Sequence, residues 1–173
     1  LAALSFVNRR ALERRGGVLF QNGALFSSLT VAQNIEVPMR EHLALPENLM
    51  REIAAMKIAM VGLPPDAGTK YPSELSGGMR KRAGLARALA LDPEIVFLDE
   101  PTAGLDPIGA SAFDALIQEL RQALGLTVFM VTHDLDSLHA ICDRIAVMAE
   151  KRVIVTGTMA QMLEFDHPWV RDY

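Results

Sequence analysis

The chain has 173 residues, of which 50% are hydrophobic and 22% charged, and its formal net charge is −4. This length and apolar content suffice for one globular domain with its own core, whereas the acidic balance disfavours a nucleic-acid-binding protein, whose phosphate contacts need a basic surface. The single cysteine, Cys142, excludes a disulfide framework, fits a reducing compartment such as the cytoplasm, and is expected to be a small core residue.

The start of the chain predicts a helix and then a buried strand. Residues 1–17 place apolar residues and arginines at helical spacing, which indicates a short amphipathic helix that ends at Gly16 or Gly17. The segment "GVLFQ" then predicts a strand that stops at Gln21. A polar residue at the carboxyl end of a buried strand is a candidate functional position.

The middle of the chain, residues 23–74, predicts a helical subdomain. Thr30 and Gln33 form a capping-box pattern, which indicates the start of a helix that Pro38 bends or ends. Apolar residues recur at helical spacing in 49–62, which predicts a second helix.

Helices and strands alternate over the rest of the chain. The expected order is helix 78–91, strand 95–98, helix 108–124, strand 126–131, a helix after Asp134, strands 145–148 and 153–156, and helix 159–163. This alternation predicts an α/β fold with a parallel sheet that helices cover on both faces. We therefore expect one domain, 1–173, in which residues 75–173 form one half of the core.

The segment "ELSGGMRKRAGL" predicts an anion site. Ser76, Gly77 and Gly78 precede a long helix, so backbone N–H groups and a hydroxyl lie at the positive end of the helix dipole. A serine N-cap with glycines for a tight turn explains the same residues without a ligand. The basic run 80–82 is expected to lie partly on the surface.

The segment "IVFLDE" ends a hydrophobic strand with two neighbouring carboxylates, Asp99 and Glu100. Two adjacent negative charges call for a counter-charge, which a magnesium ion bound together with a polyphosphate supplies; Asp99 suits the metal, and Glu100 can accept a proton from an attacking water. His133 ends the next predicted strand, and the carboxyl ends of parallel strands meet at one edge of a sheet. Taken alone, His133 is better explained as an ordinary loop histidine.

Together these stretches resemble the ATP-binding subunits of ABC transporters over nearly the whole chain. Five motifs match in the family's order: the Q-loop glutamine Gln21, the signature "LSGGM" at 75–79, the Walker B strand with Asp99 and Glu100, the D-loop "AGLD" that ends at Asp106, and the switch histidine His133. Met79 stands where the family most often has glutamine.

The resemblance implies a P-loop NTPase-like core with a mainly parallel sheet and a helical subdomain, and it implies ATP and Mg²⁺ as ligands. It assigns catalytic roles to Glu100 and His133, and metal binding to Gln21 and Asp99. The nucleotide-binding residues that it implies are Gln21, Ser76, Gly77, Gly78 and Asp106.

One family motif, the phosphate loop G-x-x-x-x-G-K-[ST], is absent from the sequence. The segment "GLPPDAGTK" at 62–70 has the wrong order and spacing, so we interpret it as a loop. In the family the phosphate loop precedes the Q-loop, so the expectation is that the chain lacks an N-terminal portion with that loop and its flanking strand and helix. We therefore expect the chain alone neither to bind ATP tightly nor to hydrolyse it.

The resemblance is greatest to the Mla-type ATPases of MCE-associated phospholipid transport in Gram-negative envelopes. The resemblance implies a head-to-tail dimer of two ATPase copies and a small regulatory subunit. It also implies a membrane permease that binds through the Q-loop and the helical subdomain, so the expected location is the cytoplasm, peripheral on the inner membrane. Residues 24–37 are the candidate permease surface; alternatively, Leu25, Leu29 and Ile35 fill the subdomain core.

Two other functions stay open at this point. The chain can be an ABC ATPase that is not coupled to transport, although the segment between Gln21 and the signature is compact and has no coiled-coil insertion. It can also be a non-catalytic partner subunit or interaction module that lost its phosphate loop, although such a module has no need to keep Glu100 and His133.

Overall fold

The computed structural model describes residues 13–167. The chain folds into two compact units, Leu1–His133 and Asp134–Tyr173, and each is described by itself. The helix expected over residues 1–17 falls mostly outside the described residues. The following strand begins at Gly16, close to its expected start.

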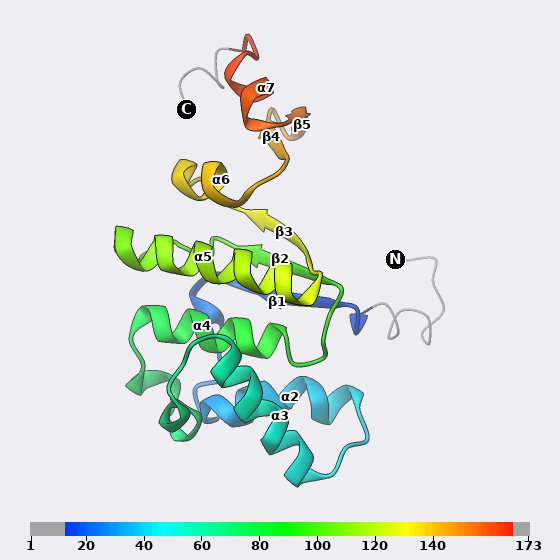
Figure 1. Cartoon of the computed structure of the whole chain (residues 1–173), viewed down its shortest axis with the longest axis vertical. Helices are drawn as coiled ribbons and strands as arrows, with labels where there is room; N and C mark the ends of the chain where they lie inside the picture. The colour runs from blue at the N-terminus through cyan, green and yellow to red at the C-terminus, as the bar shows by residue number, and fades with distance from the viewer. Residues whose placement is uncertain (1–12, 168–173) are drawn as a thin grey trace. The chain divides into compact units, whose positions relative to one another are not determined.

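The first unit is built on a three-stranded parallel sheet (Figure 1). Its strands are β1 (Gly16–Leu19), β2 (Ile95–Asp99) and β3 (Thr127–Val131), in the order β1-β2-β3. Leu19 pairs with Leu98, and Asp99 pairs with Val131, so the three strands end at nearly the same level. The residues that follow them therefore meet at one edge of the sheet, as the sequence predicts.

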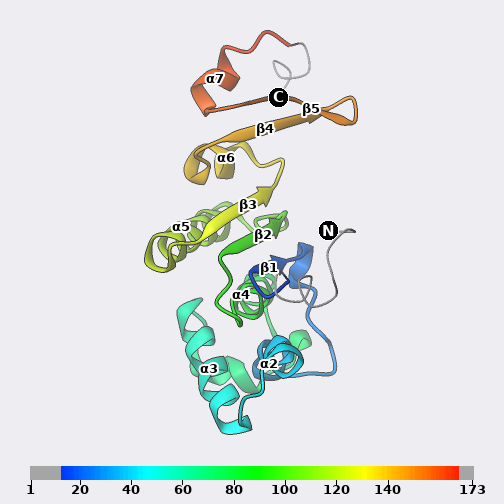
Figure 2. The same ribbon diagram turned by 90° about the vertical axis from the view of Figure 1, so that its right-hand side faces the viewer.

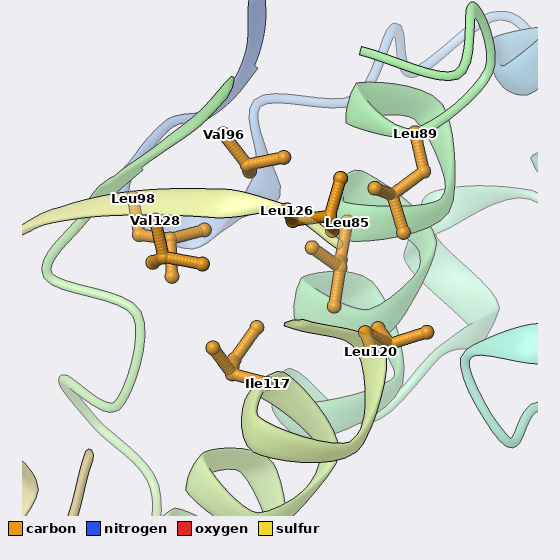
Figure 3. Close-up of a pocket in the computed structure, with 8 residues that line it drawn as sticks. All are labelled: Leu85, Leu89, Val96, Leu98, Ile117, Leu120, Leu126 and Val128. Atoms are coloured by element: carbon orange, nitrogen blue, oxygen red, sulfur yellow. The ribbon is translucent and has the colours of Figure 1, made fainter. Parts of the chain in front are cut away.

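Two long helices pack on the same side of this sheet, as Figures 1 and 2 show. They are α4 (Gly77–Ala88), which begins after the N-cap Ser76, and α5 (Pro107–Leu124), which begins after the N-cap Asp106. Figure 3 shows the apolar core between sheet and helices, and its residues are Leu85, Leu89, Val96, Leu98, Ile117, Leu120, Leu126 and Val128. The space left among them, about 10 Å³, has no room for a ligand.

The opposite face of the sheet is exposed in the described part of the first unit, so the expectation of helices on both faces is wrong for these residues. The exposed apolar side chains are Val18, Phe20, Ile95, Phe97, Phe129 and Val131. Phe97 and Phe129 are register partners on β2 and β3, and their rings lie 5.8 Å apart. The alternation of buried and exposed residues along β2 is the pattern of a sheet covered on one side.

The helical part of the first unit contains α2 (Val31–His42) and α3 (Glu47–Met60), with short 3₁₀ turns at Gln21–Gly23 (η1), Pro65–Thr69 (η2) and Pro72–Glu74 (η3). The predicted capping box of α2 is confirmed, because the Thr30 and Gln33 side chains each accept the other's backbone N–H. The helix runs through Pro38, so the proposal that Pro38 ends it is wrong. Burial of Ile35 and Met39 on either side of Pro38 offsets the hydrogen bond that proline cannot make.

Asn34 fixes the loop between the Q-loop and α2. Its Oδ1 accepts the N–H of Phe26 at 2.8 Å, and its Nδ2 donates to the carbonyls of Phe26, Leu29 and Thr30 at 3.1, 3.1 and 2.9 Å. Asn34 is fully buried, so these hydrogen bonds replace its contacts with water.

The second unit contains α6 (Leu135–Ile141), β4 (Ile145–Ala149), β5 (Arg152–Gly157) and α7 (Met159–Leu163). Here β4 and β5 form an antiparallel pair, so the extension of the parallel sheet through these strands is wrong. The reason is the connection: only Glu150 and Lys151, both with positive φ, join the strands, and a parallel pair needs a long crossover. Cys142, which follows α6, is half-buried and not a fully buried core residue.

Within residues 13–167, no helix combines the length and the apolar character required to span a bilayer.

Candidate functional site

Glu100 and His133 are in direct contact at the carboxyl edge of the parallel sheet. Oε1 of Glu100 lies 2.8 Å from Nδ1 of His133, and both residues belong to the first unit. The Glu100 side chain is 20% exposed and the His133 side chain 70% exposed, so the pair can be reached from solvent. A carboxylate held by an imidazole in this way can orient a water molecule and accept its proton.

The backbone of Glu100 is held in an unusual conformation. Its φ is 47°, in the left-handed region that residues other than glycine seldom adopt. The N–H of Glu100 donates to the Val131 carbonyl at 2.9 Å, which continues the β2–β3 ladder by one bond. The turn directs the Glu100 side chain toward His133 instead of along the strand.

Asp99 and Gln21 follow the same edge of the sheet. Asp99 is the last residue of β2, Gln21 begins the turn after β1, and both are exposed. The residues in 13–167 contain no group of three or more His, Cys, Asp or Glu side chains arranged around a metal. Mg²⁺ does not need such a group, because it takes one or two protein oxygens and completes its shell with water and phosphate. The carboxylate and the amide oxygen therefore fit a magnesium ion.

The predicted residues Ser76, Gly77, Gly78 and Asp106 lie at helix starts. Oγ of Ser76 accepts the Met79 N–H at 3.3 Å, and Oδ1 of Asp106 accepts the Gly109 N–H at 2.9 Å. Ser76 and Gly77 are exposed, and a Cβ added to Gly77 would meet no atom within 4 Å. The structure thus joins Glu100 to His133 directly, whereas Ser76 and Asp106 contact their own helices.

The basic run of α4 lies only partly on the surface, as expected for residues 80–82, because Arg80 and Arg82 are half-buried and Lys81 is buried. Each side chain donates to a backbone carbonyl: Arg80 to Leu75 at 2.8 Å, Lys81 to Glu100 at 2.9 Å and Arg82 to Val61 at 2.7 Å. Lys81 is 4% exposed. Its spacing from Leu85 and Ala88, at i+4 and i+7, is the signal that places it on the buried face of the helix.

The Q-loop turn packs directly on α4. Arg87 donates from Nη1 to the Ala24 carbonyl at 2.7 Å and from Nη2 to the Gly23 carbonyl at 2.9 Å, and its guanidinium lies 5.9 Å from the centre of the Phe26 ring. Burial lowers the pKa of Arg87. Gly84 faces the same turn, since a Cβ there would lie 2.8 Å from Cα of Gly23. Sequence reasoning did not identify either α4 residue.

The predicted loop at 62–70 contains the 3₁₀ turn η2 and no preceding strand, which agrees with its interpretation as a loop. Lys70 forms an ion pair with Asp66 at 2.7 Å, four residues earlier, and so serves the turn itself.

Comparison with known proteins identifies the family. A family model described as ABC transporter matches residues 2–103, more than half of the chain. The chain is 46% identical over 159 residues to the intermembrane phospholipid transport system ATP-binding protein MlaF of Haemophilus influenzae, which covers 91% of this chain and 60% of that protein. It is 42% identical over 157 residues to the probable ribonucleotide transport ATP-binding protein mkl of Mycobacterium tuberculosis, covering 91% of this chain and 44% of that protein.

Among solved structures, the chain resembles the dimeric post-hydrolysis state of the ATP-binding cassette MJ0796 bound to ADP and Pi. The TM-score is 0.80 at 29% identity, and the match covers 91% of this chain and 68% of that one. The chain spans less than two thirds of the length of the MlaF and mkl relatives. The fold, the order of the motifs and the family match agree: the chain belongs to the ABC transporter family.

Proposed function

We propose that the complete protein that carries this chain is the ATP-binding and ATP-hydrolysing subunit of an ABC transporter that moves phospholipids across the Gram-negative envelope. The observation that carries the proposal is the 2.8 Å contact between Glu100 and His133 at the carboxyl edge of a parallel sheet, next to Asp99. Open parallel sheets bind ligands at this edge.

In this proposal Glu100 orients the attacking water and accepts its proton, and His133 keeps the Glu100 carboxylate in place and contacts the terminal phosphate. Asp99 and Gln21 hold Mg²⁺, which neutralises phosphate charge when it is bound. Phosphoryl transfer needs little beyond such positioning and charge stabilisation.

A second copy of the protein completes each site in this proposal. The N–H groups of Gly77 and Gly78 and the hydroxyl of Ser76 face the phosphates of an ATP molecule held by the partner copy, and Asp106 lies at the contact between the two copies. The free space around Gly77 and the exposure of Ser76 support this arrangement.

A membrane permease binds beside the Q-loop in this proposal. A groove of about 360 Å³ lies there between β1, α2 and α4, and its lining includes Phe26, Pro38 and Arg87. Phe26 is exposed, whereas Ile35 is fully buried and Leu25 and Leu29 are half-buried. Within 24–37, Phe26 therefore offers the apolar contact, and Ile35 belongs to the core.

The ATPase proposal is tested by the rate of phosphate release from the complete gene product. Glu100→Gln keeps the shape of the side chain but removes the base, so turnover is expected to fall by roughly 10²- to 10⁴-fold while ATP binding is retained. Lys57→Met, on α3, serves as the control and is expected to keep the wild-type turnover. Equal turnover of wild type and Glu100→Gln would contradict the proposed role of Glu100.

A second candidate is a non-catalytic partner subunit, whose complete gene product would also lack a phosphate loop. Both candidates predict that the chain alone does not turn over ATP. For the complete gene product, only the first candidate predicts ATP turnover.

The transported substrate is tested by reconstituting the protein with its permease and following labelled phospholipid and labelled ribonucleotide in parallel. Movement of the ribonucleotide alone would contradict the phospholipid assignment.

A further inference from the structure

Lys81 connects the signature helix α4 to the backbone of Glu100. Its Nζ donates to the Glu100 carbonyl at 2.9 Å across 19 residues of sequence. Lys81 is 4% exposed, so the residue as a whole has little contact with bulk water. A buried lysine is costly unless polar groups surround its charge. The position therefore calls for an explanation beyond a solubilising surface charge.

The surroundings of Lys81 identify Glu100 as its electrostatic partner. Burial lowers the pKa of the Lys81 ammonium, and the negative charge of Glu100 acts in the opposite direction. The same carbonyl also accepts the N–H of Ala103 at 3.2 Å, so both of its acceptor positions are used. The bond from Lys81 is charge-assisted, which makes it the stronger of the two.

The conformation of Glu100 explains what this bond does. With φ at 47°, the Glu100 backbone is in the left-handed region and persists only if its neighbours hold it. The N–H is held by Val131, the carbonyl by Lys81, and the side chain by His133 at 2.8 Å. Without Lys81, the carbonyl side of this turn depends on the weaker bond from Ala103.

We infer that Lys81 is a positioning residue that holds the Glu100 turn from the signature helix and so keeps the Glu100 carboxylate against His133. The inference rests on the proposed function, in which Glu100 acts on the attacking water. The inference has a further consequence. The helix α4 carries the signature at its start and Lys81 one turn later. A shift of α4 when the partner's nucleotide binds is therefore transmitted through Lys81 to the Glu100 turn of the same subunit.

The kinetic test compares Lys81→Met with Lys57→Met in the complete gene product. Lys57 is a second buried lysine, 1% exposed, but it pairs with Asp92 and not with Glu100. A displacement of about 1 Å at a catalytic group can cost roughly 10²-fold, so we expect Lys81→Met to lower kcat by about 10- to 100-fold and to leave KM within about threefold. Lys57→Met is expected to keep kcat. If both variants fold and show the same kcat as wild type, the inference is wrong.

A double-mutant cycle separates positioning from general destabilisation. If Lys81 acts through Glu100, Lys81→Met added to Glu100→Gln should change the residual rate by less than about twofold, because the base is already absent. An equal loss in both backgrounds would overturn the inference. Should Lys81→Met not fold, Lys81→Gln, which removes the charge but keeps a polar side chain, takes its place in the same cycle.

Hydrogen exchange gives a readout that does not depend on ATP turnover. The amide protons of Glu100 and Ala103 bracket the turn, and both make the hydrogen bonds described above. Lys81→Met is expected to speed their exchange while amides in α3 keep their protection, and unchanged exchange at both would contradict the positioning role. This result stands whatever Glu100→Gln does to turnover, so failure of the inference and failure of the proposed function can be distinguished.

Discussion

Replacement of Gly84 by alanine tests the packing that joins the signature helix to the Q-loop turn. An added Cβ would lie 2.8 Å from Cα of Gly23, 2.9 Å from its carbonyl oxygen and 2.8 Å from Cδ1 of Leu19. Ordinary carbon contacts are about 3.5–4.0 Å, so the Gly23 backbone has to move by roughly 0.7 Å or more. Two of the three atoms belong to the backbone, so a side-chain rotation cannot relieve the clash.

The net cost can be worked from two opposing contributions. Overpacking of a core contact costs about 1–3 kcal/mol, and the clash with backbone puts this site at the upper end. Alanine gains up to about 1 kcal/mol over glycine in a helix interior, which leaves a destabilisation of about 2 kcal/mol.

Urea unfolding followed by far-UV circular dichroism measures this free-energy difference. Gly77→Ala is the matched control on the same helix, because a Cβ there meets no atom within 4 Å, and its unfolding free energy is expected to stay within about 0.5 kcal/mol of wild type. A Gly84→Ala protein that is as stable as Gly77→Ala would refute the close approach of α4 and the Q-loop turn.

Three further changes test other parts of the structure. Asn34→Ala removes four hydrogen bonds to the loop before α2, one of them the part-buried bond from the Phe26 N–H, so the unfolding free energy is expected to fall by about 2–3 kcal/mol in urea titrations. A loss below about 0.5 kcal/mol would mean that water replaces the amide. Asp92→Asn removes the carboxylate that lies 2.5 Å from the buried Lys57 ammonium, so the unfolding free energy is expected to fall by about 1–2 kcal/mol. This loss is expected to exceed the loss caused by Lys57→Met. A larger loss for Lys57→Met would show that the pair is not coupled in solution. The hydrogen bond from Arg15 holds the pKa of Glu94 below its ordinary value of 4.5, so this carboxylate stabilises the fold above that pH and loses the effect as the pH falls through the lowered pKa. Thermal unfolding of wild type and Glu94→Gln is therefore expected to differ at pH 7 and to converge on acidification, and a difference that grows in acid would contradict this assignment.

The positions of most helices and strands follow from local sequence signals. Thr30 with Gln33 marks a helix start because the two side chains accept backbone N–H groups, and the structure confirms it. The strand 95–98 and the helix 159–163 match β2 and α7 to within one residue. These signals are local and do not depend on contacts between residues that are far apart in the sequence.

The errors lie where a distant contact decides the outcome. The antiparallel pairing of β4 and β5 depends on the two-residue turn at Glu150 and Lys151, which lacks the glycine or asparagine that usually signals such a turn. The burial of Lys81 depends on Glu100, 19 residues away, and the close packing of Gly84 depends on Gly23. Helical spacing indicates the buried side of α4, but it does not identify the partner.

The candidate site was predictable in part for the same reason. Parallel strands bring their carboxyl ends together, so Asp99, Glu100 and His133 were expected at one edge before the structure was known. The direct contact of Glu100 with His133 requires the left-handed turn at Glu100, and no sequence pattern near a glutamate predicts a positive φ.

The structure of the Glu100→Gln gene product with ATP and Mg²⁺ is the most direct test of a nucleotide site shared between two copies. We predict that the metal lies against Asp99 and that the terminal phosphate lies between residue 100 and His133 of one copy and Ser76 of the other. A nucleotide bound away from Asp99, or phosphates that no Ser76 of a second copy approaches, would contradict the account.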